Sequence, residues 1–161
     1  MNKLRKIREL SWLERWILVR AAVLLVVAEA GLRLLPLQSL LKWIPEGEAR
    51  KPLASSPDPE RIAWLVDVAA RHSLLRGRLR PTCLRKSLVL CALLRNHGVD
   101  ARLVIGTNVS RNFGPQENFR AHSWVIAEAK VLLAGERTQY VELAAFGSNV
   151  SERQIESRQT A

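Results

Sequence analysis

A cysteine placed at the start of a helix constrains this chain more than any other feature. Residues 80–90 read RPTCLRKSLVL, so Pro81 and Thr82 stand directly before Cys83 and an apolar, helix-periodic run follows it. Proline suits a helix start and threonine suits the N-cap position. The first turn of a helix carries unpaired backbone N–H groups and the positive end of the helix dipole, and both stabilise a thiolate. Cys83 is therefore the candidate nucleophile.

A histidine that opens a strand-like run is the matching candidate for a base. His122 begins the segment HSWV about forty residues after Cys83. A histidine beside a cysteine takes the thiol proton and later returns it to a leaving amine. His97 ends the helix of Cys83 and lies about 20 Å along its axis, which makes it a poor base for that thiol. The Cys83–His122 pair predicts acyl-transfer chemistry through a thioester.

The second cysteine is expected to be structural. Cys91 lies in the middle of the same predicted helix as Cys83, roughly 12 Å along the axis, which is too far for a disulfide. A free cysteine at mid-helix usually packs as a small hydrophobic residue. Free thiols and the lack of a signal-peptide pattern predict a cytoplasmic protein.

Hydrophobic periodicity predicts an α+β fold, with helices first and a small antiparallel sheet after them. We expect a helical N-terminal arm over residues 1–50, a Pro- and Ser-containing linker over 51–59, a core over 60–147 and a tail over 148–161. In the core, Asp58 is the expected N-cap of a helix that starts at Pro59. The expected helices and strands of the core and arm are 16–36, 37–43, 59–75, 83–97, 101–107, 121–127, 130–133 and 139–146.

The apolar N-terminal arm is not expected to cross a membrane. A spanning helix needs roughly 20 predominantly apolar residues, whereas the longest uncharged run between Trp16 and Pro36 is Ala21 to Ala28. We expect a buried helix that packs on the core or on a partner. The basic residues before it, Lys3, Arg5, Lys6 and Arg8, are candidates for peripheral contact with anionic lipid.

The charge of the chain favours acidic partners. Its formal net charge is +10, which attracts nucleic acid, anionic lipid or acidic peptide. The basic residues are scattered with little aromatic interleaving, so we do not expect nucleic acid as the partner. Neither a CxxC pair nor HExxH occurs, and we expect no metal and no cofactor.

Four segments in order carry a family resemblance. They are PTCL at 81–84, LRNHGV at 94–99, ARLVIG at 101–106 and AHSWV at 121–125. Together they resemble the transglutaminase-like, papain-like cysteine peptidases of lasso-peptide biosynthesis, of the microcin-processing type, over roughly 61–146. In that family the peptidase is free-standing or the C-terminal half of a fused B protein. The resemblance implies a protease that removes the leader from a ribosomally made precursor peptide.

The resemblance also implies partners and site residues. A separate leader-recognition protein would capture the leader by adding a strand, and an ATP-dependent lasso cyclase would use the freed amine. Cys83 matches the family nucleophile and His122 the general base. The family often has an aspartate where this chain has Ala134, and Glu136 is the nearest carboxylate.

The position of Glu136 depends on the hairpin turn. A turn centred on Glu128 and Ala129 places Gly135 opposite His122, whereas a turn centred on Ala129 alone places Glu136 there. A one-residue slip changes which face a side chain takes, and both arrangements stay open from the sequence.

Other expectations concern the surroundings of the thiol. The backbone N–H of Cys83 is the expected first oxyanion donor, and Trp124 would shield His122 from water or fill the core. Arg78, Arg80 and Arg85 would favour the thiolate or form a solvated basic rim.

Two functional alternatives remain beside the peptidase. The first is a non-catalytic peptide- or membrane-binding scaffold. The second is a transglutaminase-like acyltransferase, which uses the same thioester and an amine acceptor.

Overall fold

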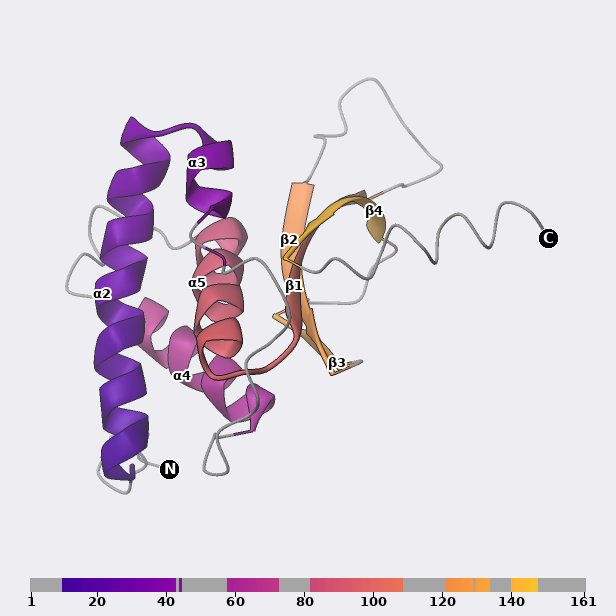
Figure 1. Ribbon diagram of the computed structural model, residues 1–161. Coiled ribbons are helices and arrows are strands. Elements are labelled where there is room, and N and C mark those ends of the chain that lie inside the picture. Colours follow the sequence, from indigo (N-terminus) through magenta and orange to yellow (C-terminus); the bar gives the residue numbers. More distant parts are fainter. Residues whose placement is uncertain are drawn as a thin grey trace.

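Helices cover one face of a small antiparallel sheet (Figure 1). In this computed structural model the described residues are 10–42, 44, 58–72, 82–108, 121–128, 130–133 and 140–147. The helices are α2 (Trp12–Leu34), α3 (Leu37–Leu41), α4 (Pro59–His72) and α5 (Cys83–Asn96), and the strands are β1 (Ala101–Asn108), β2 (Ala121–Ala127), β3 (Lys130–Leu132) and β4 (Tyr140–Phe146). The predicted α+β class is confirmed.

Helix α5 is the centre of the core. It lies between α2 and the sheet in Figure 1, and it packs against α2, α4, β1 and β2. Leu90, Cys91, Leu93 and Leu94 are fully buried, because apolar residues cover most of the circumference of the helix. This confirms the predicted burial on most sides. Gly98 ends the helix with a positive φ of 83°, a conformation that glycine adopts without steric cost.

Helix α2 begins earlier than the predicted Trp16. Ser11 accepts a hydrogen bond from the backbone N–H of Glu14, and the Glu14 carboxylate accepts one from the Ser11 N–H. This capping box has the sequence signature S-x-x-E, so the start was readable at 11–14. The helix ends at Leu34, two residues before Pro36.

Helix α2 packs on the core, as expected, but only one of its faces is buried. Its inner face packs on α4 and α5 through residues such as Ile17, Ala21 and Leu25. Its outer face exposes large apolar side chains, among them Trp12 and Trp16. No helix among the described residues is long and apolar enough to cross a membrane.

The sheet has the strand order β3-β2-β1-β4, with every described pair antiparallel. The four strands match the predicted segments closely. In the β2–β3 hairpin Ala127 pairs with Lys130, so the turn is the one centred on Glu128 and Ala129. Leu133, directly after β3, has a φ of +61°, which interrupts the extended backbone and its regular alternation of faces.

The expected division of the chain remains a prediction. Because α2 packs on α4 and α5, its inner face belongs to the same core as these two helices. The expected linker lies almost entirely, and the expected tail wholly, outside the described residues.

A buried ion pair joins α2 to the start of α5. The carboxylate of Glu29 pairs with Arg85 of α5 and with Arg33 one turn along α2, the latter at 2.8 Å. The side chains of Glu29 and Arg85 are 7% and 16% exposed, whereas that of Arg33 is 64% exposed. Arg85 therefore secures the helix start against α2 and is not part of a solvated basic rim.

Arg85→Ala is expected to lower the free energy of unfolding by about 3 kcal/mol, because it leaves a carboxylate buried without its main partner. Arg33→Ala removes the exposed partner of the same carboxylate and is expected to cost about 0.5 kcal/mol. Urea denaturation measures both variants. Equal losses would contradict the assignment of Arg85 as the main partner of Glu29.

Candidate active site

Cys83 is the first residue of α5 and is half-buried. Thr82 occupies the N-cap position with an extended backbone, as predicted, but its hydroxyl makes no capping hydrogen bond among the described residues. The first backbone bond of the helix runs from the Lys86 N–H to the Thr82 carbonyl at 3.3 Å. No described side chain caps the N–H groups of this first turn, which lie beside the thiol, where an oxyanion would form.

His122 and Cys83 lie at the same end of the molecule. Helix α5 runs toward Gly98, β1 returns after a short turn, and β2 runs antiparallel to β1. The start of β2 therefore lies beside the start of α5, as Figure 1 shows. The topology therefore places the helix that begins at Cys83 and the strand that holds His122 at the same end of the fold.

A buried hydrogen bond connects these two starts directly. The hydroxyl of Ser87, one helical turn after Cys83, donates to the carbonyl of Ser123 at 3.0 Å. Residues four apart share a face of a helix, so Cys83 lies on the side of α5 that meets β2. Ser123 follows His122 directly in β2. In the described residues β3 pairs only with Val125–Ala127 of β2. The Ser87–Ser123 hydrogen bond therefore lies beyond the end of β3.

The faces of β2 have different neighbours. Ser123, Val125 and Ala127 are buried on the side of the helices, and alternation along the strand directs His122 and Trp124 to the other side. The His122 ring is stacked with Trp124 at a centroid distance of 6.3 Å. The His122 ring thus lies on the face of the sheet that is turned away from α5, at the end where α5 begins.

An aromatic group surrounds His122. The ring of Tyr140 in β4 lies 5.1 Å from the imidazole and 6.0 Å from the ring of Trp124, centroid to centroid. Gly106, opposite His122 in β1, makes room for this group, because a Cβ there would lie 2.6 Å from the Trp124 ring. Trp124 thus packs beside the imidazole, one of the two roles expected for it.

The Nε2 atom of His122 is buried and has no hydrogen-bond partner among the described residues. A buried polar atom normally has a partner, and no described residue supplies one to this nitrogen. It is available to exchange a proton with a thiol or a substrate amine.

Cys91 cannot serve as the nucleophile. It is fully buried, and its Sγ lies 3.5 Å from the carbonyl of Ala101, to which it donates. Burial raises the pKa of this thiol to about 12, so it stays protonated at neutral pH. The prediction that Cys91 is a small core residue is confirmed.

The sequence did not reveal two side chains on the face of His122. Tyr140 and Glu142 belong to β4, and Glu142 is opposite Gly106, which is opposite His122. Glu142 therefore shares the face of His122 at about 10 Å between Cα atoms, two strand spacings away. The strand β4 was predicted from the sequence. Its position beside β1 was not, because it depends on a pairing between segments far apart in the chain.

The remaining predicted residues lie outside the described part of the chain. These are Arg78, Arg80, Ala134 and Glu136. Leu133 departs from the extended backbone, and Glu136 follows it outside the described residues, so its role stays a prediction. Among the described residues no group of His, Cys, Asp and Glu is arranged to hold a metal ion.

The family of the chain follows from a comparison with protein families. The model of the transglutaminase-like superfamily matches residues 22–145, which includes α2 from Ala22 onward, the helices α3, α4 and α5, the strands β1, β2 and β3, and β4 up to Ala145. The chain therefore belongs to the transglutaminase-like superfamily. Comparisons with curated proteins and with solved structures found no match.

The Ser87–Ser123 hydrogen bond makes a testable contribution. Ser87→Ala is expected to lower the free energy of unfolding by about 1 kcal/mol or more, because it leaves the buried Ser123 carbonyl without this donor. Ser123→Ala is the matched control. Its hydroxyl is buried and unpaired among the described residues, so its removal is expected to be neutral or slightly stabilising. If urea denaturation shows equal losses for both, the hydrogen bond does not hold α5 on β2.

Proposed function

We propose that this protein is a cysteine peptidase that removes the leader from a ribosomally synthesised lasso-peptide precursor. The observation that carries the proposal is the hydrogen bond from Ser87 to Ser123. It joins the helix that begins at Cys83 to β2, the strand that holds His122. Membership in the transglutaminase-like superfamily supports the thioester chemistry.

The chemistry assigns a role to each of these groups. The thiolate of Cys83 attacks the scissile carbonyl, and the resulting oxyanion is stabilised by the backbone N–H of Cys83. His122 takes the thiol proton and gives it to the leaving amine as the C–N bond breaks, which leaves a thioester. His122 then takes a proton from water, the hydroxide attacks the thioester, and the proton returns to the Cys83 sulfur.

The substrate class rests on the order and spacing of the four sequence segments around Cys83 and His122. We propose that a leader-recognition protein presents the precursor and that a lasso cyclase uses the freed amine. The net charge of +10 would attract acidic segments of a leader.

The two thiols give the sharpest test of this mechanism. Cys83→Ala is expected to abolish cleavage of the precursor in the presence of the recognition protein, whereas Cys91→Ala retains it. His122→Ala is expected to lose roughly 10²–10⁴-fold in rate. Mass spectrometry of the products after a single turnover measures all three.

Several outcomes would contradict the proposal. Cleavage retained by Cys83→Ala excludes this nucleophile, and equal losses for both cysteine variants identify a folding defect. A product in which an added amine, rather than water, has taken the acyl group would instead identify the acyltransferase of the same superfamily.

The third catalytic group is assigned to Glu136. A carboxylate that accepts the second imidazole N–H fixes the tautomer and stabilises the imidazolium. We expect Glu136→Gln to reduce turnover by roughly 10–100-fold, which is less than in a serine triad because a thiol ionises more readily.

Glu142→Gln is the matched control for Glu136→Gln. Glu142 is an exposed carboxylate on the face of His122, and its replacement is expected to change turnover by less than about twofold, in line with other exposed charges. If only Glu142→Gln lowers turnover, Glu142 of β4 and not Glu136 orients His122. Wild-type rates for both would mean that Cys83 and His122 act as a dyad.

A further inference from the structure

An apolar stripe follows the outer face of α2. Trp12, Trp16, Val19, Val23 and Val26 repeat at intervals of four and three residues and are all exposed. The exposed fractions of Trp12 and Trp16 are 84% and 61%. Helix α2 is the outermost element on its side of the fold (Figure 1). Contiguous exposed apolar surface of this kind marks an interaction site.

The charges around the stripe are positive. Both carboxylates of α2 are directed toward other groups: Glu14 bonds to Ser11 and pairs with Arg61, and Glu29 pairs with Arg33 and Arg85. Arg15 and Arg20 are exposed on the same helix. The sequence before the helix, residues 1–9, contains four cations and one carboxylate.

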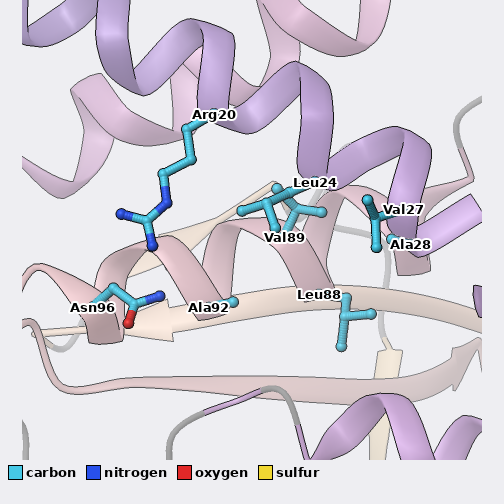
Figure 2. Close-up of a pocket in the computed structure, with 8 residues that line it drawn as sticks. All are labelled: Arg20, Leu24, Val27, Ala28, Leu88, Val89, Ala92 and Asn96. Atoms are coloured by element: carbon cyan, nitrogen blue, oxygen red, sulfur yellow. The ribbon is translucent and has the colours of Figure 1, made fainter.

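A hollow lies beside the stripe, between α2 and α5. Its volume is about 250 Å³. Figure 2 shows apolar side chains along most of it, with Arg20 and Asn96 at one end. The lining residues are Arg20, Leu24, Val27, Ala28, Leu88, Val89, Ala92 and Asn96. An apolar recess with a cation at its end suits an alkyl chain that carries an anionic head group.

We propose that the outer face of α2 docks on an anionic membrane surface, with the helix axis parallel to the bilayer. Tryptophan is favoured at the boundary between head groups and acyl chains, and Trp12 and Trp16 project at the end of the helix next to the basic segment. An apolar face flanked by cations binds anionic lipid by burial and by charge attraction. This proposal does not depend on the proposed function.

Charge favours lipid over a second copy of this chain. In a pair of packed stripes the Arg20 cations of the two copies would meet no carboxylate of α2, because Glu14 and Glu29 pair within their own copy. Like charges across an interface oppose association. An anionic lipid surface compensates these cations.

Vesicle co-sedimentation with the full chain tests the proposal. We expect binding to vesicles of phosphatidylcholine with about 30 mol% phosphatidylglycerol and weak binding to pure phosphatidylcholine. The double variant Trp12→Ser/Trp16→Ser is expected to lower the partition coefficient by about tenfold or more, because it removes the largest apolar groups of the face. Arg20→Glu is expected to weaken binding and to reduce its dependence on salt.

The matched control is Val141→Ser/Leu143→Ser. These residues are exposed large apolar residues of β4, at 51% and 58%, and their replacement should leave vesicle binding unchanged. Thermal melting checks that both double variants are folded. Absence of binding to anionic vesicles, or binding that the tryptophan variant retains, would overturn the proposal. A dimer in size-exclusion chromatography that the tryptophan variant dissociates, without vesicle binding, would identify a protein interface instead.

Discussion

The contact between the start of α5 and the start of β2 is the constraint on which the site depends. Cys83 belongs to α5 and His122 to β2, and these two elements are separated in sequence by β1 and residues 109–120. The Ser87 hydroxyl supplies a buried hydrogen bond across this contact. The ion pair of Arg85 with Glu29 holds the opposite side of the same helix turn on α2. The start of α5 is thus held on two sides. A catalytic side chain needs such support, because its position must be held to within about 0.5 Å.

The local features of the fold were predictable because each has a local cause. Thr82 and Gly98 mark the ends of α5, and the alternating segment after His122 marks a strand. The position of Tyr140 beside His122 was not predictable, because it depends on β4 pairing with β1 and not with its sequence neighbour β3. Such pairings are set by packing over the whole sheet and not by the pattern of one strand.

The hydrophobicity of α2 predicted a buried helix packed on the core or on a partner, and only one of its faces meets the core. An apolar residue count does not distinguish the face that packs on a core from the face that stays exposed, and α2 is apolar on both. Glu29 shows that the sequence pattern also fails to tell whether a charged residue is buried. In sequence it interrupts an apolar run, whereas in the fold it is the buried partner of Arg85. Hydropathy therefore identified the helix but not the orientation of its two faces.

The central claim is that Cys83 and His122 act on the same bond, and bifunctional alkylation tests it most directly. Dibromoacetone first alkylates a reactive thiol and then bridges it to a nitrogen within a few ångströms. Peptide mapping of the treated native protein should find Cys83 joined to His122, and the bridge should be lost in His122→Ala while single alkylation of Cys83 remains. A bridge from Cys83 to another residue, or a thiol that is alkylated without any bridge in the wild-type protein, would contradict the account.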